Sequence, residues 1–124
     1  MEVKMFVRAI RGAITVSENT KESILEATRE LLIEIIKRND LNELDIISAI
    51  FTVTSDLNAT FPAIAARELG WTNISLMCTN EIDVPNSLKS CVRVMIYINT
   101  DKQNDQIEHV YLKGAKVLRP DLSK

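Results

Sequence analysis

The sequence has few of the residues that build flexible linkers, metal sites or covalent catalytic centres. Its 124 residues include only three glycines, three prolines, two cysteines and one histidine. So little glycine and proline is not typical of a flexible linker or a disordered tail, and no internal repeat occurs. One histidine and two separated cysteines lack the spacing of a zinc site, and no glycine-rich phosphate-binding motif is present. We therefore expect a single domain, residues 1–124, with no metal and no cofactor.

Charge and hydropathy argue against two further classes of protein. The 15 Lys and Arg residues nearly balance the 17 Asp and Glu residues, which gives a net charge of −2 and predicts no nucleic-acid-binding face. No apolar run approaches the roughly 20 residues that span a bilayer. Residues 1–4 lack the basic-then-apolar pattern of a secretion signal. We expect a cytoplasmic protein in which Cys78 and Cys91 are reduced thiols.

Apolar periodicity predicts one long and one short helix. The long amphipathic helix runs from about Lys21 to Arg38, and either Asn19 or Thr20 is its cap. The short helix covers residues 63–69, because a proline precedes it and a glycine follows it.

The predicted strands share the chain with these helices. They cover residues 3–16 with a bulge or bend near Arg11-Gly12, 46–54, 74–78, 91–98 and, as one strand or two, 109–118. The resulting order β-α-β-α-β-β-β predicts an α+β fold, in which one long amphipathic helix plus a short helix cover a mixed sheet. The other face of the sheet also carries apolar residues, so we expect it to meet another subunit.

Two arginines lie on strands that are otherwise apolar. Arg93 interrupts the run 91–98, which has the pattern of a buried strand, and Arg11 extends the strand face shared by Val3, Met5, Val7 and Ala9. A guanidinium stays charged, and its burial is costly unless an anionic partner meets it. We therefore expect a carboxylate of the protein or of a ligand opposite Arg93, in a site built to hold an acid.

The charged residues leave two interpretations open. Arg11, Arg67, Arg93, Arg119 and Glu81 form either a ligand site or structural and intersubunit ion pairs.

A catalytic nucleophile has weaker support. His109 with Cys78 or Cys91 is the one available nucleophile–base pair, and lone histidines are usually structural. General acid–base catalysis by Glu81 or Asp83 stays open.

Short segments spread along the chain together resemble the small trimeric chorismate mutases of the Bacillus and Thermus type. Each segment alone is weak, but they occur in unbroken order from about Val7 to Leu122. The segments are Ile10-Arg11-Gly12-Ala13, Thr54-Ser55-Asp56-Leu57, Phe61-Pro62-Ala63, Arg67-Glu68-Leu69, Cys78, Glu81-Ile82-Asp83-Val84, Cys91-Val92-Arg93-Val94-Met95, His109-Val110-Tyr111-Leu112 and Val117-Leu118-Arg119-Pro120-Asp121-Leu122.

This resemblance implies both an assembly and a reaction. The assembly is a homotrimer, a pseudo-α/β-barrel with sheets at its centre, helices outside and active sites between neighbouring subunits. The reaction is the rearrangement of chorismate to prephenate, on the route to phenylalanine and tyrosine, without a cofactor. A non-catalytic trimeric protein that binds small acids and a trimeric imine deaminase are the alternatives.

The resemblance also assigns roles to individual residues. Arg93 is similar to the arginine that faces the breaking ether bond, while Arg11 and Tyr111 are similar to groups that bind a substrate carboxylate. Glu81 and Cys78 correspond to groups that hold the ring hydroxyl. Positions that line the pocket or its mouth are Phe61, Ala63, Arg67, Leu76, Met77, Leu118 and Arg119. Ile64 departs from the pattern, since some relatives carry a lysine there.

Overall fold

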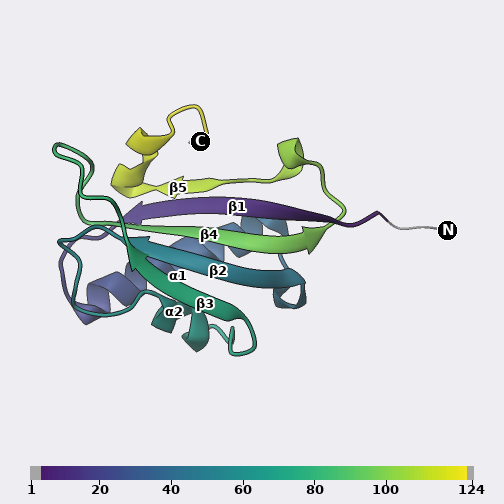
Figure 1. Ribbon diagram of the computed structural model, residues 1–124, viewed down its shortest axis with the longest axis horizontal. Coiled ribbons are helices and arrows are strands. Elements are labelled where there is room, and N and C mark those ends of the chain that lie inside the picture. Colours follow the sequence, from purple (N-terminus) through teal and green to yellow (C-terminus); the bar gives the residue numbers. More distant parts are fainter. Residues whose placement is uncertain (1–3, 123–124) are drawn as a thin grey trace.

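The computed structural model describes residues 4–122, and its strands form one mixed sheet with the order β3-β2-β4-β1-β5 (Figure 1). The strands are β1 (Phe6–Thr15), β2 (Ile46–Val53), β3 (Ser75–Asn80), β4 (Cys91–Thr100) and β5 (Val110–Leu112). Central β4 is antiparallel to both neighbours, whereas the edge strands β3 and β5 are parallel to theirs. The mixed sheet and the predicted order of helices and strands are confirmed.

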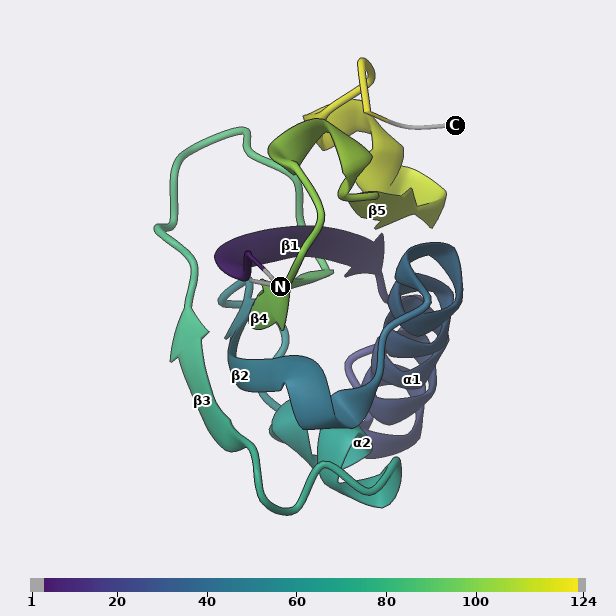
Figure 2. The same cartoon turned by 90° about the vertical axis from the view of Figure 1, so that its right-hand side faces the viewer.

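The helices α1 (Lys21–Asn39) and α2 (Ala63–Glu68) lie on the same side of the sheet (Figure 2). Thr20 is the cap of α1, because its hydroxyl accepts the Ser23 N–H at 3.1 Å. Asn19 instead accepts backbone N–H groups of the loop before α2. The predicted α+β fold, with one long and one short helix covering the sheet, is therefore confirmed. Neither helix within residues 4–122 is long and apolar enough to cross a membrane.

Gly12 allows α1 to approach the sheet closely. The predicted bulge near this residue is wrong, because β1 pairs with β4 in unbroken register from Phe6 to Thr15. A Cβ built on Gly12 would lie 2.7 Å from Ile35 Cδ1 and 3.2 Å from Leu31 Cδ1, both on α1. The glycine therefore removes a side chain where the helix packs.

The predicted strand over residues 109–118 is only partly correct. Pairing with β1 stops at Leu112, and Lys113–Leu118 forms a 3₁₀ helix. Lys113 has a φ of 52°, which turns the chain away from the sheet, and the Gly114 N–H donates to Thr15 Oγ1 at 3.0 Å. This 3₁₀ helix packs Ala115 against Tyr111.

The side of the sheet opposite α1 is called the open face below. Strand alternation and cross-strand pairing assign to it Val7, Ala9, Arg11, Ile50, Thr52, Met77, Arg93, Met95 and Tyr97. Val7 and Met77 are more than 60% exposed, so apolar side chains on this face are uncovered in the single chain. Met5 precedes β1 and is 54% exposed, and Val3, which was predicted to share its face, lies outside the described residues.

The prediction that β4 is buried on both sides is wrong. Val92, Val94 and Ile96 pack into the core beneath α1, whereas Arg93 lies on the open face with its side chain 44% exposed. Arg93 therefore has access to solvent and to a ligand in the single chain.

Candidate active site

Strand register places the main candidate residues in one row across the open face. Arg93 of β4 is opposite Thr52 of β2 on one side and Ala13 of β1 on the other, and Ala13 is opposite Tyr111 of β5. Directly opposed residues are about 5 Å apart, so this row is compact. Ala13 itself is fully buried in a cluster that includes Cys91 and Tyr111.

On the same face of the sheet, Arg93 and Tyr111 line a cavity of about 270 Å³. Arg11, Thr52, Glu81, Arg93 and Tyr111 supply its polar groups, and Ile50 and Met95 are among its apolar lining residues. Two guanidinium groups face one carboxylate, so the cavity carries excess positive charge. Its volume and charge suit a small anion with several oxygen atoms.

Among residues 4–122, Glu81 is the carboxylate within ion-pair distance of Arg93. Its backbone N–H donates to the Val53 carbonyl at 2.9 Å, which holds the residue just beyond the end of β3. Its Oε1 lies 3.9 Å from Arg93 Nε, which is long for an ion pair, and both side chains are partly exposed. Such a pair contributes little to stability, so Arg93 can turn towards a ligand at low cost.

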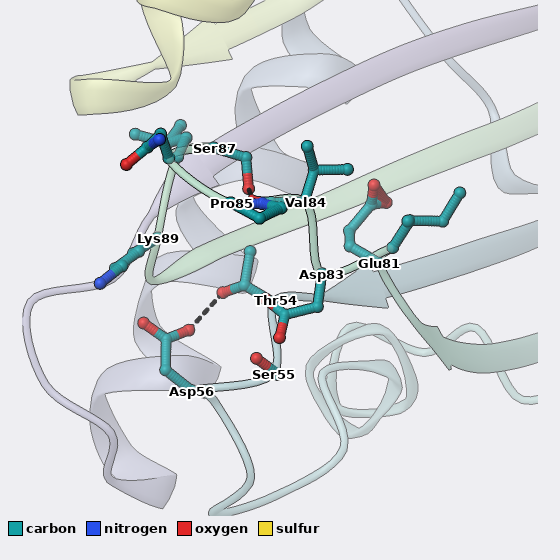
Figure 3. Close-up of a pocket in the computed structure, with 12 residues that line it drawn as sticks. Thr54, Ser55, Asp56, Glu81, Asp83, Val84, Pro85, Ser87 and Lys89 are labelled. Atoms are coloured by element: carbon teal, nitrogen blue, oxygen red, sulfur yellow. Dashed lines mark hydrogen bonds between the residues drawn. The ribbon is translucent and has the colours of Figure 1, made fainter.

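A second, solvent-facing cleft of about 390 Å³ lies beside this cavity, between the loop 81–89 and the end of β2 (Figure 3). Asp56 accepts hydrogen bonds from Thr54 Oγ1 at 2.5 Å and from the Ser90 N–H at 3.0 Å. Thr54 Oγ1 in turn accepts the Cys91 N–H at 3.0 Å. These bonds fix the first residue of β4, two positions before Arg93.

Replacing Asp56 by Asn should loosen the start of β4. The hydrogen bond from Thr54, and then those from Ser90, lower the pKa of Asp56 in spite of the opposing effect of burial. A lowered carboxyl pKa adds stability that is present above the unfolded value of 3.8 and is lost as the pH falls through the folded pKa. We expect Asp56→Asn to reduce the free energy of unfolding at neutral pH by about 1 kcal/mol after solvent screening.

Urea denaturation at pH 7 and near pH 3 measures this effect of Asp56. The deficit of the variant should shrink at the lower pH, because protonation weakens the same bonds in the parent chain. Asp83→Asn, in the same cleft, is the matched control. An equal loss in the free energy of unfolding at both pH values would contradict a stabilising role for the ionised Asp56 carboxylate.

His109 contacts the backbone of Arg11. The Arg11 N–H donates to His109 Nδ1 at 2.9 Å, so this nitrogen carries no proton. Burial, followed by the charges of Arg11 and Arg119, lowers the pKa of His109, and Glu108 opposes the shift. The imidazole is therefore neutral at pH 7.

The cysteines do not join this histidine. Cys91 is buried, its sulfur lies 3.8 Å from the Val92 carbonyl oxygen, and burial raises its pKa, so the thiol stays protonated. Cys78 is opposite Phe51, a core residue, and therefore faces the helix side of the sheet. These contacts leave no cysteine–histidine nucleophile–base pair among residues 4–122.

Phe61 and Cys78 line a different cavity, of about 510 Å³, between the loop 57–62 and the end of β3. Phe61 is 67% exposed. Because Cys78 and Arg93 are on opposite faces of the sheet, the single chain divides the predicted site residues into two groups.

The other predicted pocket positions lie around these two groups. On the helix side, Ala63 is buried in the core and Leu76 packs against the core partly buried, whereas Arg67 is exposed on α2. On the open face, Met77 is 63% exposed. Near Tyr111, Leu118 packs against the cluster that contains Ala13 and Cys91. Arg119 donates to Asp121 at 2.8 Å and 3.1 Å.

The chain matches the family model described as chorismate mutase type I over residues 7–122. It belongs to that family. It is 48% identical to chorismate mutase AroH of Bacillus subtilis (strain 168) over 120 residues, which cover 96% of this chain and 94% of the relative. It is 49% identical to chorismate mutase AroH of Thermus thermophilus over 117 residues, which cover 94% of this chain and 96% of the relative.

A solved structure agrees with this type I chorismate mutase assignment. The structure of chorismate mutase from Clostridium thermocellum has a TM-score of 0.88 and 62% sequence identity, and the match covers 89% of this chain and 98% of that one. The family resemblance predicted from the short segments is therefore confirmed.

Two residues of this family member were not predicted as site residues: Thr52 lines the cavity, and His109 is not part of the lining but binds the backbone of Arg11, which is part of it. Thr52 is next to Arg93, and its hydroxyl oxygen is buried with no hydrogen bond to the described residues. Period-two alternation could have placed Thr52 on the open face. His109 was considered only as a base, because its bond to Arg11 depends on a parallel pairing that has no local sequence signal.

Proposed function

We propose that the chain rearranges chorismate to prephenate in the cavity of the open face, by positioning and charge alone. One observation carries the proposal: strand register brings Arg93, Arg11, Glu81 and Tyr111 around one small cavity in a chain of the chorismate mutase type I family. The Bacillus and Thermus relatives of this chain are themselves named chorismate mutases.

The reaction explains why no nucleophile is needed. A [3,3] rearrangement breaks one C–O bond and forms one C–C bond within the same molecule, so no proton moves and no covalent intermediate forms. The protein has to hold the flexible enolpyruvyl side chain over the ring, and fixing such a geometry can supply several kcal/mol of the barrier. We assign Arg11 and Tyr111 to the substrate carboxylates, and Glu81 to the ring hydroxyl.

Arg93 has the second task. The ether oxygen becomes more negative as its bond lengthens, and a cation at that atom stabilises the transition state more than the ground state. A guanidinium suits this position because its donors are fixed in a plane and it stays protonated. Its long contact with Glu81, at 3.9 Å, leaves it able to turn towards the oxygen.

We further propose that the site is completed by a second copy in a cytoplasmic homotrimer. Cys78 faces the helix side of the sheet and Arg93 the open face, and the two residues line different cavities, so we assign the two groups of one site to different chains. The exposed Val7 and Met77 provide apolar surface for the neighbouring subunit. A neighbour that covers the open face would also exclude water from Arg93 and strengthen its charge interaction.

Incubating the purified protein with chorismate and assaying prephenate tests the activity directly. Product formation that saturates with substrate is the expected result. Binding without product would favour the non-catalytic acid-binding protein instead.

The turnover number should be nearly independent of pH around neutrality. We expect kcat to change by less than about twofold between about pH 7 and about pH 9, because guanidinium groups do not titrate there. Steady-state kinetics at constant ionic strength provide the measurement. A steep change in kcat would point to His109 or a cysteine as an acid or base, in contradiction to a mechanism without proton transfer.

A further inference from the structure

His109 supplies a hydrogen bond that the sheet itself does not make. Parallel pairing of β1 with β5 begins at Gly12 opposite Val110, so the backbone of β5 does not reach the preceding Arg11 N–H. The His109 side chain accepts this N–H at 2.9 Å. The imidazole therefore extends the β1–β5 ladder by one bond, at the residue whose side chain enters the cavity.

This bond requires a neutral imidazole with its proton on Nε2, since Nδ1 must offer a lone pair. The charged groups that face the ring agree with that state: Arg11 on β1 and Arg119 after the C-terminal 3₁₀ helix both disfavour a positive ring. Glu108, which precedes His109 in the chain, favours a positively charged ring, and Asp121 forms an ion pair with Arg119.

We propose that His109 is a positioning residue, whose Nδ1 fixes the backbone of Arg11 and thereby the place where the Arg11 guanidinium meets a substrate carboxylate. The role of Arg11 in binding rests on the proposed function. On the other side of the strand, Gly12 packs tightly against α1. The backbone of Arg11 is thus fixed in two ways: the adjacent Gly12 packs against α1, and His109 accepts the Arg11 N–H at the sheet edge.

Three variants separate the hydrogen bond from the bulk of the side chain. His109→Asn places its amide oxygen where Nδ1 lies, His109→Gln places its amide where Nε2 lies, and His109→Leu keeps the volume without an acceptor. With chorismate as substrate, we expect KM to rise about five- to tenfold in the Leu and Gln variants, with a smaller change in kcat, and to stay within about threefold in the Asn variant.

The pH profile provides a second readout. Protonation of His109 removes the acceptor, so KM of the parent chain should rise as the pH falls below the ordinary imidazole pKa of 6.5, whereas His109→Asn should lack that step. Any other titration, that of the substrate included, affects both proteins, so the difference between the two profiles isolates His109. Equal KM values in the Asn and Leu variants, or the same pH step in the Asn variant, would overturn the proposal.

Amide hydrogen exchange tests the positioning without turnover. The Arg11 amide should be protected in the parent chain and in His109→Asn, and should exchange faster in His109→Leu. Unchanged protection in His109→Leu would overturn the proposal. If the protein made no prephenate while this exchange pattern held, the hydrogen bond would stand and the proposed function would fail.

Discussion

Replacing Arg93 by citrulline should lower kcat at least about 10³-fold and raise KM less than about tenfold. Citrulline keeps the planar shape and most of the hydrogen-bond donors of arginine but carries no charge. Since charge builds on the ether oxygen mainly in the transition state, the lost attraction should appear in kcat. A loss of 10³-fold corresponds to about 4 kcal/mol.

Semisynthesis and single-turnover kinetics with chorismate measure this effect of Arg93. Arg38→citrulline on α1 is the matched control, because its ion pair with Glu34 lies on the exposed surface of the helix. A tenfold or larger rise in KM with kcat preserved would show that Arg93 only binds the substrate. Arg93→Lys should recover only part of kcat, since a single ammonium lacks the planar fork.

The fold follows from patterns that act over short stretches of chain. The spacing of Ile24, Leu31 and Ile35 predicts α1 because these side chains share one face of a helix, and that face packs on the sheet. The end of the last strand was missed, because the positive φ of Lys113 gives no hydropathy signal. Gly12 was assigned to a bulge or bend, but a glycine is needed there because α1 packs so close that a Cβ would lie 2.7 Å from Ile35 Cδ1. Such a tertiary contact has no local sequence signal.

The candidate site depends on register and faces, which local patterns do not determine. Arg93 was expected to be buried because its neighbours are apolar, yet alternation gives it the open face while Val92 and Val94 fill the core. Arg93 lies in a row with Thr52, Ala13 and Tyr111, and this row can be predicted only when the pairing of four strands is known. The family segments named Arg93 and Tyr111, but only the structure shows that Cys78 faces the other side of the sheet.

Two inactive variants should restore activity when they assemble together. Arg93→Gln disables the cavity of the open face. Cys78→Asp places a negative charge in the other cavity, which Phe61 and Cys78 line, where it would repel a dianionic substrate. Each variant alone should lose at least about 99% of the activity of the parent chain. If every site takes one cavity from each of two neighbouring subunits, a mixed assembly contains some sites in which both cavities are intact.

Random mixing of equal amounts makes about one quarter of the sites intact, and selecting mixed trimers raises this to about one third, because each mixed trimer has one intact site among three. Co-expression with two different affinity tags, followed by purification over both tags, selects mixed assemblies for the prephenate assay. The matched control pairs Arg93→Gln with Arg11→Ala, since both changes alter the same cavity and no arrangement of those two chains creates an intact one. Recovery in the first mixture but not in the second requires sites shared between subunits. No recovery in either mixture, with both tags retained, would mean that Arg93 and Cys78 do not act on one substrate from different chains.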